Sequence, residues 1–232
     1  MLSIIIPAYN EEHYLPALLS SIKKQNLKNI EIIVADNSSR DRTRQIARKF
    51  GCRVVKGGKR PGIGRNNGAK IAKGSLLLFL DADCCLKPGF IRGILKEFRK
   101  KDLGVAGCFL RPMSDRLVDR AYFSIFNTFT KLSEKTSPSL GGCCILVKRD
   151  IHRKIGGFDE DIRLLEEHDY VKRCRRYGRF RIISRKIDTS VRRFDEFGRI
   201  KVGSALVLSA AYKTLFGPIK KDIFHYSFNY KK

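Results

Sequence analysis

Short apolar runs alternate with helical patterns along the N-terminal half of this 232-residue chain, and this alternation constrains the fold most strongly. The runs are residues 2–6, 31–35, 53–55 and 76–80. Each is bounded by turn-forming or charged residues, which is typical of buried strands. Alternation of strands with helices predicts parallel strands joined by right-handed crossovers. We therefore expect an α/β fold with a mostly parallel central sheet and helices on both faces.

The segments between these runs carry apolar residues at helical spacing. The first such stripe is Tyr14, Leu15, Leu18, Leu19 and Ile22. Its helix is expected to begin near residues 13–15, which places Pro16 in the first turn. Further helices are expected at 43–50, at 66–73, from Pro88 through Phe98, and at 115–135 and 166–177. Further strands are expected at 105–110, 144–148 and 180–184, and the length favours one well-cored domain.

Polar residues follow three of the expected strands, at residues 7–11, 36–41 and 81–83. In an open parallel sheet, ligands bind beyond the carboxyl ends of the strands. If these strands are neighbours, the three segments face one crevice. We expect the chemistry of the protein to lie there.

Asp81 and Asp83 directly follow the strand at 76–80. Alternate side chains of an extended chain share a face, so the two carboxylates repel each other unless a cation is near. Carboxylate oxygens suit magnesium or manganese, which keep waters and bind substrate phosphates. The pair is therefore a candidate metal site, and a turn that caps the following helix is the alternative interpretation.

The formal charge of +25 attracts polyanions such as nucleic acid, nucleotides or an anionic membrane face.

The seven cysteines show no C-x-x-C spacing, which argues against a zinc or redox site and favours free thiols in a reducing compartment. No apolar stretch reaches the ~18 residues that a spanning helix needs. No signal peptide is expected, because the first strand begins directly after Met1.

Four motifs follow one another in order: SIIIPAYNEE, EIIVADNSSRDRT, GIGRNNGAKIAKG and LLLFLDADC. Gly141-Gly142, GGFD at 156–159 and EEHD at 166–169 come later. This series closely resembles glycosyltransferase family 2, the inverting enzymes with the GT-A fold. The resemblance implies a catalytic domain at 1–200, with a nucleotide-binding half at 1–110 and an acceptor-binding half at 111–200. A basic amphipathic tail at 201–232 would follow it.

The resemblance also implies a nucleotide site. Pro7, Ala8, Tyr9 and Glu11 match the first nucleotide-binding loop, in which Tyr9 could stack on the base and Glu11 could accept from a ribose hydroxyl. Asp36 matches the aspartate that accepts from a ring N–H of the base. Uracil and guanine both offer such an N–H, so both stay open.

Asn37 stands where the family usually has a second aspartate, which weakens the assignment of the base slightly. Asn10 and Ser39 could instead be helix caps, and Tyr9 could be a surface aromatic residue.

The segment GIGRNNG is glycine-rich, but its spacing is not that of the dinucleotide fingerprint. The resemblance places Arg65 and Asn66 over the nucleotide sugar and diphosphate, with Arg65 as a charge-assisted phosphate contact. It also places Asp81, Ala82 and Asp83 against the donor. An ordinary basic turn is the alternative for this segment. The polar residues after the last expected strand, Asp188, Ser190, Arg192 and Arg193, match those that close over the diphosphate in this family.

Glu166 and Glu167 match the acidic pair that supplies the catalytic base in this family. The second position is normally aspartate, and Glu167 is one methylene longer, so its carboxylate must be set back. Its implied role is to take the proton from the acceptor hydroxyl. The alternative interpretation is that both acids only stabilise the first turn of a helix, where the macrodipole favours negative charge. Gly141 and Gly142 would admit close approach of the sugar or acceptor, and His168 is expected to be a polar surface residue.

The expected activity is transfer of one sugar from a UDP- or GDP-linked donor to an acceptor hydroxyl or phosphate, with inversion and with manganese or magnesium as cofactor. The chain has no tryptophan and so lacks the Q-x-x-R-W motif of processive synthases. A nucleotidyltransferase that makes a sugar nucleotide is one alternative, but its glycine-rich, lysine-containing signature does not follow the first strand. A basic nucleic-acid-binding protein is another, although no nucleic-acid motif is evident, so no nucleic-acid partner is expected.

The pattern of residues in the tail predicts a helix with one apolar face. This face consists of Val202, Ala205, Leu206, Leu208, Ala211, Tyr212, Leu215 and Phe216. Lysines lie near its end, and aromatic residues and lysines continue through 224–232. Such a helix can lie in a membrane interface, where the positive charge adds attraction to anionic lipid. The acceptor would then be lipid-linked, such as a polyprenyl phosphate or a glycan on one. Packing on the catalytic domain or on a second subunit is the alternative. The expected location is the cytoplasm, or the cytoplasmic face of a membrane.

Overall fold

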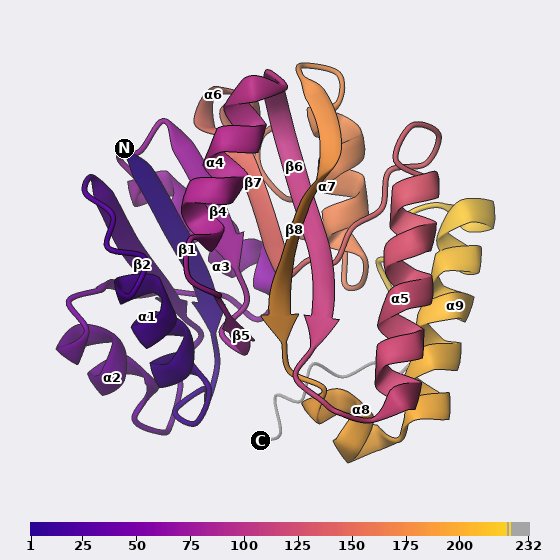
Figure 1. Cartoon of the computed structure of the whole chain (residues 1–232), viewed down its shortest axis with the longest axis horizontal. Coiled ribbons are helices and arrows are strands. Elements are labelled where there is room, and N and C mark those ends of the chain that lie inside the picture. The colour runs from indigo at the N-terminus through magenta and orange to yellow at the C-terminus, as the bar shows by residue number, and fades with distance from the viewer. Residues whose placement is uncertain (222, 224–232) are drawn as a thin grey trace.

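The computed structural model describes residues 1–221 and 223 (Figure 1). Its strands are β1 (Leu2–Ala8), β2 (Ile30–Asp36), β3 (Arg53–Lys56), β4 (Leu76–Leu80), β5 (Cys84–Cys85), β6 (Leu103–Pro112), β7 (Cys144–Lys148) and β8 (Arg179–Thr189). Its helices are α1 (Leu15–Lys23), α2 (Thr43–Lys49), α3 (Pro61–Ile71), α4 (Phe90–Lys100), α5 (Leu117–Leu132), α6 (Arg149–Lys154), α7 (Glu166–Cys174), α8 (Arg192–Phe197) and α9 (Arg199–Phe216).

The strands form one sheet in the order β3-β2-β1-β4-β7-β6-β8-β5. Strands β1 to β4 pair in parallel, as expected from the alternation of strands and helices. β7 pairs antiparallel with both β4 and β6, while β6 and β8 are parallel. Because β2, β1 and β4 are neighbours, the segments that follow them meet at one edge of the sheet, as predicted.

The core lies on both faces of the sheet, and side chains of each central strand alternate between the two. Ile4 and Ile6 of β1 pack with α1, α2 and α4, whereas Ile5 packs with α3, α6 and α7. Each of these three isoleucines is fully buried. Burial of such a side chain contributes about 1.5–3 kcal/mol, so this double-sided core provides the main stabilisation of the site edge.

Helix α3 begins at Pro61, five residues before the expected start at Asn66. The glycine-rich segment is thus helical rather than an extended loop, and proline occupies its first turn. A Cβ on Gly68 would stand 2.4 Å from Cγ2 of Ile5, and one on Gly64 would stand 3.2 Å from Cβ of Pro7. These glycines therefore allow α3 to pack closely on β1.

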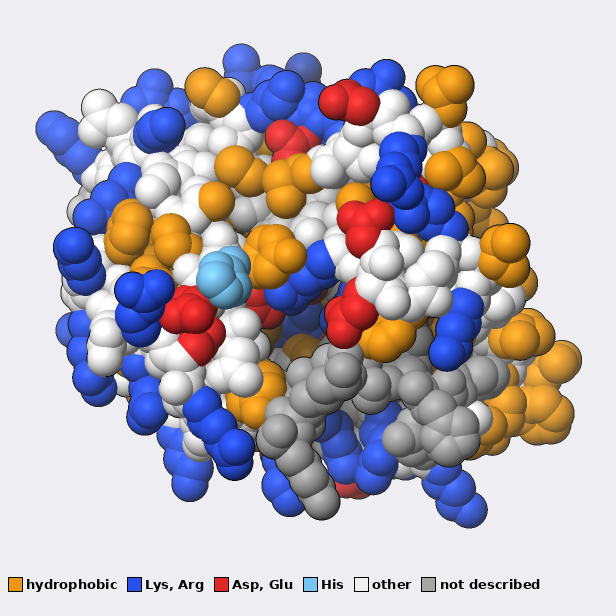
Figure 2. Space-filling model, turned by 90° about the horizontal axis from the view of Figure 1, so that it is seen from below, with side chains coloured by type: hydrophobic (Ala, Val, Ile, Leu, Met, Phe, Trp, Pro, Cys, Tyr) orange, Lys and Arg blue, Asp and Glu red, His pale blue; other side chains and the backbone are white. Residues whose placement is uncertain are grey.

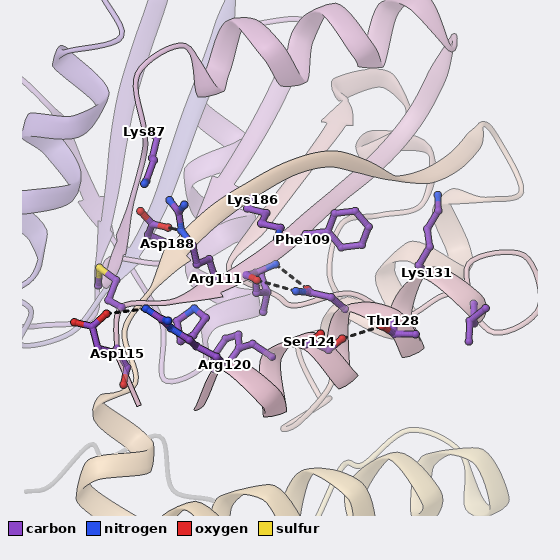
Figure 3. A pocket seen from close by; sticks show the side chains of 17 residues that line it. Lys87, Phe109, Arg111, Asp115, Arg120, Ser124, Thr128, Lys131, Lys186 and Asp188 are labelled. Atoms are coloured by element: carbon purple, nitrogen blue, oxygen red, sulfur yellow. Dashed lines mark hydrogen bonds and ion pairs between the residues drawn. The ribbon is translucent and has the colours of Figure 1, made fainter. Parts of the chain in front are cut away.

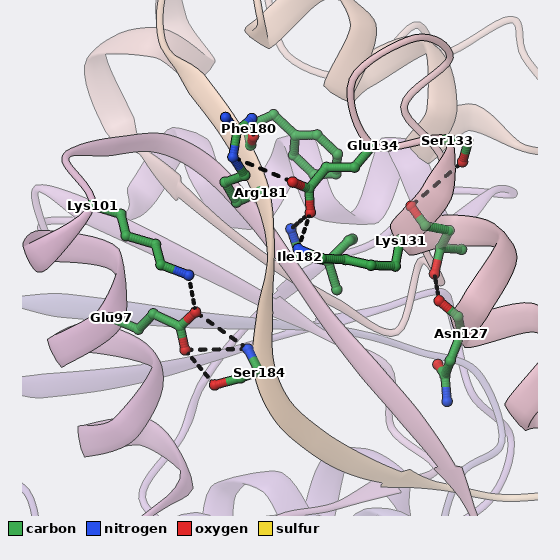
Figure 4. Close-up of polar contacts among 11 residues, drawn as sticks. Glu97, Lys101, Asn127, Lys131, Ser133, Glu134, Phe180, Arg181, Ile182 and Ser184 are labelled. Carbon is green, nitrogen blue, oxygen red and sulfur yellow. Dashed lines mark hydrogen bonds and ion pairs between the residues drawn. The ribbon is translucent and has the colours of Figure 1, made fainter.

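Two glutamates satisfy the backbone donors along the outer edge of β8 (Figure 4). Glu134 accepts from the amide of Ile182 at 2.8 Å, and Glu97 accepts from the amide and hydroxyl of Ser184 at 3.2 and 2.7 Å. The register of β6 against β8 shifts between Cys108 and Phe109, next to this point. The side chains of α4 and of the segment after α5 thus cover an edge that would otherwise be free to pair.

Helices α5, α8 and α9 form a further layer beside β6 (Figure 1). Phe123 of α5, Phe194 of α8 and Val202 of α9 share one apolar cluster, and Arg199 donates to both oxygens of Asp119 at 2.7 and 2.9 Å. The C-terminal helix therefore packs on the remainder of the chain, which was one of the two expectations for it. Val202, expected on an exposed apolar face, instead lies in this cluster.

The outer sides of α5 and α9 still expose apolar side chains, which gather along the right edge of Figure 2. On α5 these are Leu117, Val118, Ile125, Phe129 and Leu132, and on α9 they are Ile200, Val207, Leu208, Leu215 and Phe216. We call this set the α5/α9 patch. No helix in the described part of the chain is long and apolar enough to cross a membrane. The segment 224–232, expected to extend the tail, lies outside the described residues.

Candidate active site

Five acidic side chains gather where β1 and β4 end and α7 begins, and Figure 2 shows acidic and basic side chains around a hollow on this face. They are Glu11, Asp81, Asp83, Glu166 and Glu167, which we call the carboxylate cluster. Two arginines, Arg65 and Arg192, are inserted among them. Acids therefore outnumber bases in the cluster, although the molecule as a whole is strongly basic.

Arg65 of α3 joins the two halves of the cluster. Its guanidinium donates to Asp81 at 2.9 Å, to Glu166 at 2.6 Å and to the carbonyl of Gly142 at 3.2 Å. Burial alone would lower the pKa of Arg65, but Asp81 and Glu166 more than offset this and raise it. Arg65 is thus permanently charged, and it fixes the start of α7 against the end of β4.

Glu167 lies beside this pair and is buried. Burial, and then the charge of Glu166, raise the pKa of Glu167 to about 8. A Cβ on Gly142 would stand 3.4 Å from Cδ of Glu167, an ordinary contact, so the glycine leaves extra room on this side of the carboxylate. A buried carboxyl that titrates near neutral pH has the property required of a general base.

The backbone immediately before the acidic pair is strained. Leu165, at the N-cap of α7, has a φ of 60°, in the left-handed region that leucine rarely adopts. Residues held in such a conformation cost on the order of 1–3 kcal/mol and cluster at functional sites. This turn orients Glu166 and Glu167 at the first turn of α7.

Arg192 of α8 joins the segment that follows β1 to the Asp81–Asp83 segment. Its guanidinium donates to both oxygens of Glu11 at 2.9 and 2.6 Å and lies 3.1 Å from Asp83. It also stacks 4.5 Å from the ring centre of Tyr14. Sequence analysis named Arg192 only within the polar segment after the last strand that would close over the diphosphate, and it did not place Tyr14 in the site. No sequence signal paired Arg192 with Glu11.

Asp36 is almost fully buried at the end of β2. Its Oδ2 accepts from the amide of Ser39 at 3.1 Å and lies 3.6 Å from Arg44. Its Oδ1 has no hydrogen-bond partner among the described residues. A buried acceptor without a donor is costly, and a ring N–H of a nucleobase would satisfy it. Tyr9, also predicted here, is half-buried in the adjoining loop.

Asn66 lies one residue from Arg65, but its amide holds the GGFD loop. It donates to the carbonyl of Phe158 and to Glu160, each at 2.9 Å, and accepts from the amide of Phe158 at 2.8 Å. Gly157 has a φ of 79°, and a Cβ there would stand 2.5 Å from Asn66 Oδ1. In the structure, Asn66 therefore positions this loop. Its predicted contact with the nucleotide-sugar donor stays a prediction.

His168, expected at the surface, is buried. Its Nδ1 lies 2.8 Å from Nζ of Lys213 on α9, and its Nε2 lies 3.7 Å from Oε1 of Glu167. The expectation was wrong because Lys213 of α9 and the backbone of Leu140 both contact the ring. No local pattern in the sequence shows that a segment 45 residues later returns to this histidine.

The donor set suits a divalent cation only in part. Burial, and to a lesser extent the charge of Asp81, raise the pKa of Asp83, and carboxylate oxygens are the ligands that magnesium and manganese prefer. Within residues 1–221 and 223, no group of three His, Cys, Asp or Glu side chains is placed to hold a metal ion. A cation here would therefore need oxygen ligands from water and from a bound substrate, as is usual for magnesium-type sites.

A separate groove of about 930 Å³ lies between α5 and the strands β6 and β8 (Figure 3). Its charged lining includes Arg111, paired with Asp188, and Arg120, paired with Asp115 at 2.8 Å. Lys87 and Lys186 also line it. None of the carboxylate cluster lines this groove, so the candidate active site is the cluster rather than the groove.

Solved structures of known proteins share this fold. A mannosyltransferase of Pyrobaculum calidifontis, solved with GDP-Man and Mn2+, superposes with a TM-score of 0.75 at 19% identity, over 92% of this chain and 63% of that one. Staphylococcus aureus TarS residues 1–349, solved with UDP-GlcNAc, superposes with a TM-score of 0.66 at 21% identity, over 82% of this chain and 58% of that one. The fold is therefore that of the GT-A glycosyltransferases.

A family model described as glycosyl transferase family 2 matches residues 3–156, and the chain belongs to this family. An uncharacterized glycosyltransferase of Haemophilus influenzae is 29% identical over 180 residues, which are 74% of this chain and 60% of that protein. The match thus spans less than two thirds of that relative.

Proposed function

We propose that this chain transfers a single sugar from a nucleoside-diphosphate sugar to an acceptor hydroxyl or phosphate, with inversion at the anomeric carbon. The observation that carries the proposal is the arrangement around Arg65, which ties the Asp81 end of β4 to Glu166, beside a buried Glu167 with a pKa raised to about 8. UDP- and GDP-linked donors both stay open. The solved relatives that hold GDP-Man and UDP-GlcNAc support this class of donor.

The side chains of the cluster divide the work of the reaction. Asp36 Oδ1 would accept from the base, and Arg192 would contact the diphosphate that Pro7, Ala8 and Ala82 border. Glu167 would take the proton of the acceptor hydroxyl as its oxygen attacks the anomeric carbon. Arg65 and Glu166 would hold this base at a fixed distance from the donor, and Gly141 and Gly142 would leave room for the acceptor.

A divalent cation bound at Asp81 and Asp83 would supply neutralisation of charge on the departing diphosphate. The presence of Mn2+ with GDP-Man in the solved mannosyltransferase supports manganese or magnesium as the cofactor. The absence of a third carboxylate or histidine ligand among the described residues predicts that cation and nucleotide bind together.

We further propose a lipid-linked acceptor, such as a polyprenyl phosphate or a glycan on one, reached at the cytoplasmic face of a membrane. The α5/α9 patch and the net charge of +25 support this proposal. Apolar side chains beside basic residues allow a helix to lie in a membrane interface without spanning it. α9 also lies next to His168, so a membrane surface at the patch would be near the acceptor side of the cluster.

The test is thermal unfolding with UDP and GDP, each with manganese and with chelator. We expect one nucleotide to raise Tm, and to raise it more with manganese. Asp83→Asn keeps the side-chain size and should abolish the manganese-dependent part. Equal stabilisation with and without chelator would remove the cation from the proposal, and no stabilisation by any nucleoside diphosphate would remove the nucleotide-sugar donor. Sugar-nucleotide consumption by the same samples then distinguishes transfer from synthesis of a sugar nucleotide.

A further inference from the structure

Three side chains from two helices form a line that ends at the candidate base. Lys213 of α9 places Nζ 2.8 Å from Nδ1 of His168, and His168 places Nε2 3.7 Å from Oε1 of Glu167. His168 and Glu167 are buried, and Lys213 is half-buried. Lys213 lies outside the family motifs in the sequence, and His168 is the third residue of EEHD, where the resemblance gave it no role. They join the C-terminal helix to the active site.

The contact between Lys213 and His168 determines which nitrogen of the imidazole ring carries the proton. A lysine ammonium only donates, so Nδ1 of His168 must accept, and the neutral ring then carries its proton on Nε2. Burial, and then the charge of Lys213, lower the pKa of His168 to about 3, so the ring stays neutral at physiological pH. The only N–H of the ring is then on Nε2, which lies 3.7 Å from Oε1 of Glu167, and the same N–H is the donor available to the Leu140 backbone.

The charges that surround this line come from several elements. Glu167 faces Glu166 from its own helix, Arg65 from α3 and Asp81 from the end of β4. Lys213 faces Glu167, and Lys172 and Asp169 of α7 lie nearby. The neutral His168 ring lies between Lys213 and Glu167. The position of α9 therefore affects the position of the Glu167 carboxylate through this ring.

We propose that Lys213 and His168 are positioning residues that hold the Glu167 carboxylate toward the acceptor, so that α9 completes the active site. This inference rests on the proposed function, because Glu167 must be the base for its position to matter. The separation of 3.7 Å is longer than a hydrogen bond. Hydrogen bonds of catalytic groups are often long without substrate and shorten in the substrate complex. The hydrogen bond with Leu140 links the ring to the segment next to Gly141-Gly142, the loop on the acceptor side of Glu167.

The activity test compares Lys213→Met with Lys213→Arg, and with Lys201→Met as the matched control on an exposed part of the same helix. Lys213→Met should lower kcat about tenfold, the scale of one lost charge-assisted hydrogen bond, with KM for the donor within about twofold. Lys213→Met removes a positive charge near Glu167 and the contact that keeps the ring proton on Nε2, and both changes raise the pKa of Glu167. The acid limb of the pH–rate profile should therefore move to higher pH. Lys213→Arg should restore most of the rate, and Lys201→Met should change nothing.

Nitrogen-15 NMR of the His168 ring tests the contact without relying on activity. The wild-type ring should be protonated on Nε2 and stay neutral from about pH 5 to 8, and Lys213→Met should raise its pKa but leave it below the ordinary value of about 6.5, because burial is the larger cause of the shift. A wild-type ring that titrates near 6.5, or unchanged kcat and pH limb in Lys213→Met, would overturn the inference. Absence of sugar transfer by the wild type with every donor and acceptor would overturn the proposed function instead, while the NMR result would still decide the contact.

Discussion

At the scale of single residues, two arginines organise the site by pairing with acids that are distant in sequence. Arg65 meets Glu166 across 101 positions, and Arg192 meets Glu11 across 181 positions. Each guanidinium contacts acids on two different segments, so it fixes the distance between them. Arg65, Glu166 and Glu11 are buried, so removing the partner of any of these three is costly, because the remaining charge would stay buried without its counter-charge.

Glu167→Gln should leave nucleotide binding intact and lower transfer about 100-fold or more, because it keeps the size and removes the basicity. The wild-type rate should rise with pH and level off above about pH 8, where Glu167 is ionised. The check is a pH–rate profile together with nucleotide binding. Near-normal turnover of the variant would move the role to Glu166 or Asp169.

The stability of Glu167→Gln should also differ from that of the wild type, and the difference should depend on pH. The pKa of Glu167 is raised from 4.5 to about 8 on folding, so the folded state holds this proton more tightly than the unfolded state does. Wild-type stability should therefore fall as pH rises through that window, whereas Gln cannot ionise. The difference in Tm between Glu167→Gln and the wild type should grow between these two pH values and be flat outside them. A constant difference would mean that burial does not raise this pKa.

At the scale of elements, helix α3 forms because it packs on β1, and its amino-acid composition alone would not favour a helix. Its glycines weaken an isolated helix, since each costs about 1 kcal/mol relative to alanine. The close approach of Gly68 to Ile5 explains why the helix nevertheless keeps glycine there.

Gly68→Ala should therefore destabilise the protein by about 1–3 kcal/mol, although alanine favours helices, because the new Cβ would overlap Ile5. Gly62→Ala is the matched control on the same helix, since its Cβ would stand 3.4 Å from that of Phe158, an ordinary contact. We expect this control to be neutral or slightly stabilising. Denaturant unfolding of both variants makes the comparison, and equal losses would show that α3 does not pack on β1 this closely.

At the scale of the whole molecule, the fold leaves an apolar side on a very basic protein. The α5/α9 patch combines a helix from the middle of the chain with the C-terminal helix, and Arg199 and Asp119 hold the two together. A tail that acted alone would bring only the α9 half of this surface to a membrane.

The protein should co-sediment with vesicles that contain anionic phospholipid at physiological salt, and less so at high salt, because screening weakens the attraction of its positive charge. Ile125→Glu on α5 and Leu208→Glu on α9 should each weaken this binding, and both residues are exposed, so the fold should persist. Tyr177→Glu, an exposed position outside the patch, is the control. If all four proteins stay in the supernatant, the membrane proposal fails. A concentration-dependent dimer that the two patch variants abolish would assign the patch to a second copy of the chain.

The sequence by itself determined the strands β1 to β4, the α/β class, and the family through its ordered motifs, because local hydrophobic periodicity and short motifs are properties of contiguous residues. It also placed Glu167 and the Asp81–Asp83 pair at strand and helix ends. Only the tertiary structure decided that Arg192 reaches Glu11, that Asn66 holds the GGFD loop, and that His168 lies buried beneath Lys213. These contacts join segments far apart in the chain, and no local pattern encodes a partner that only the packing of helices on the sheet brings near.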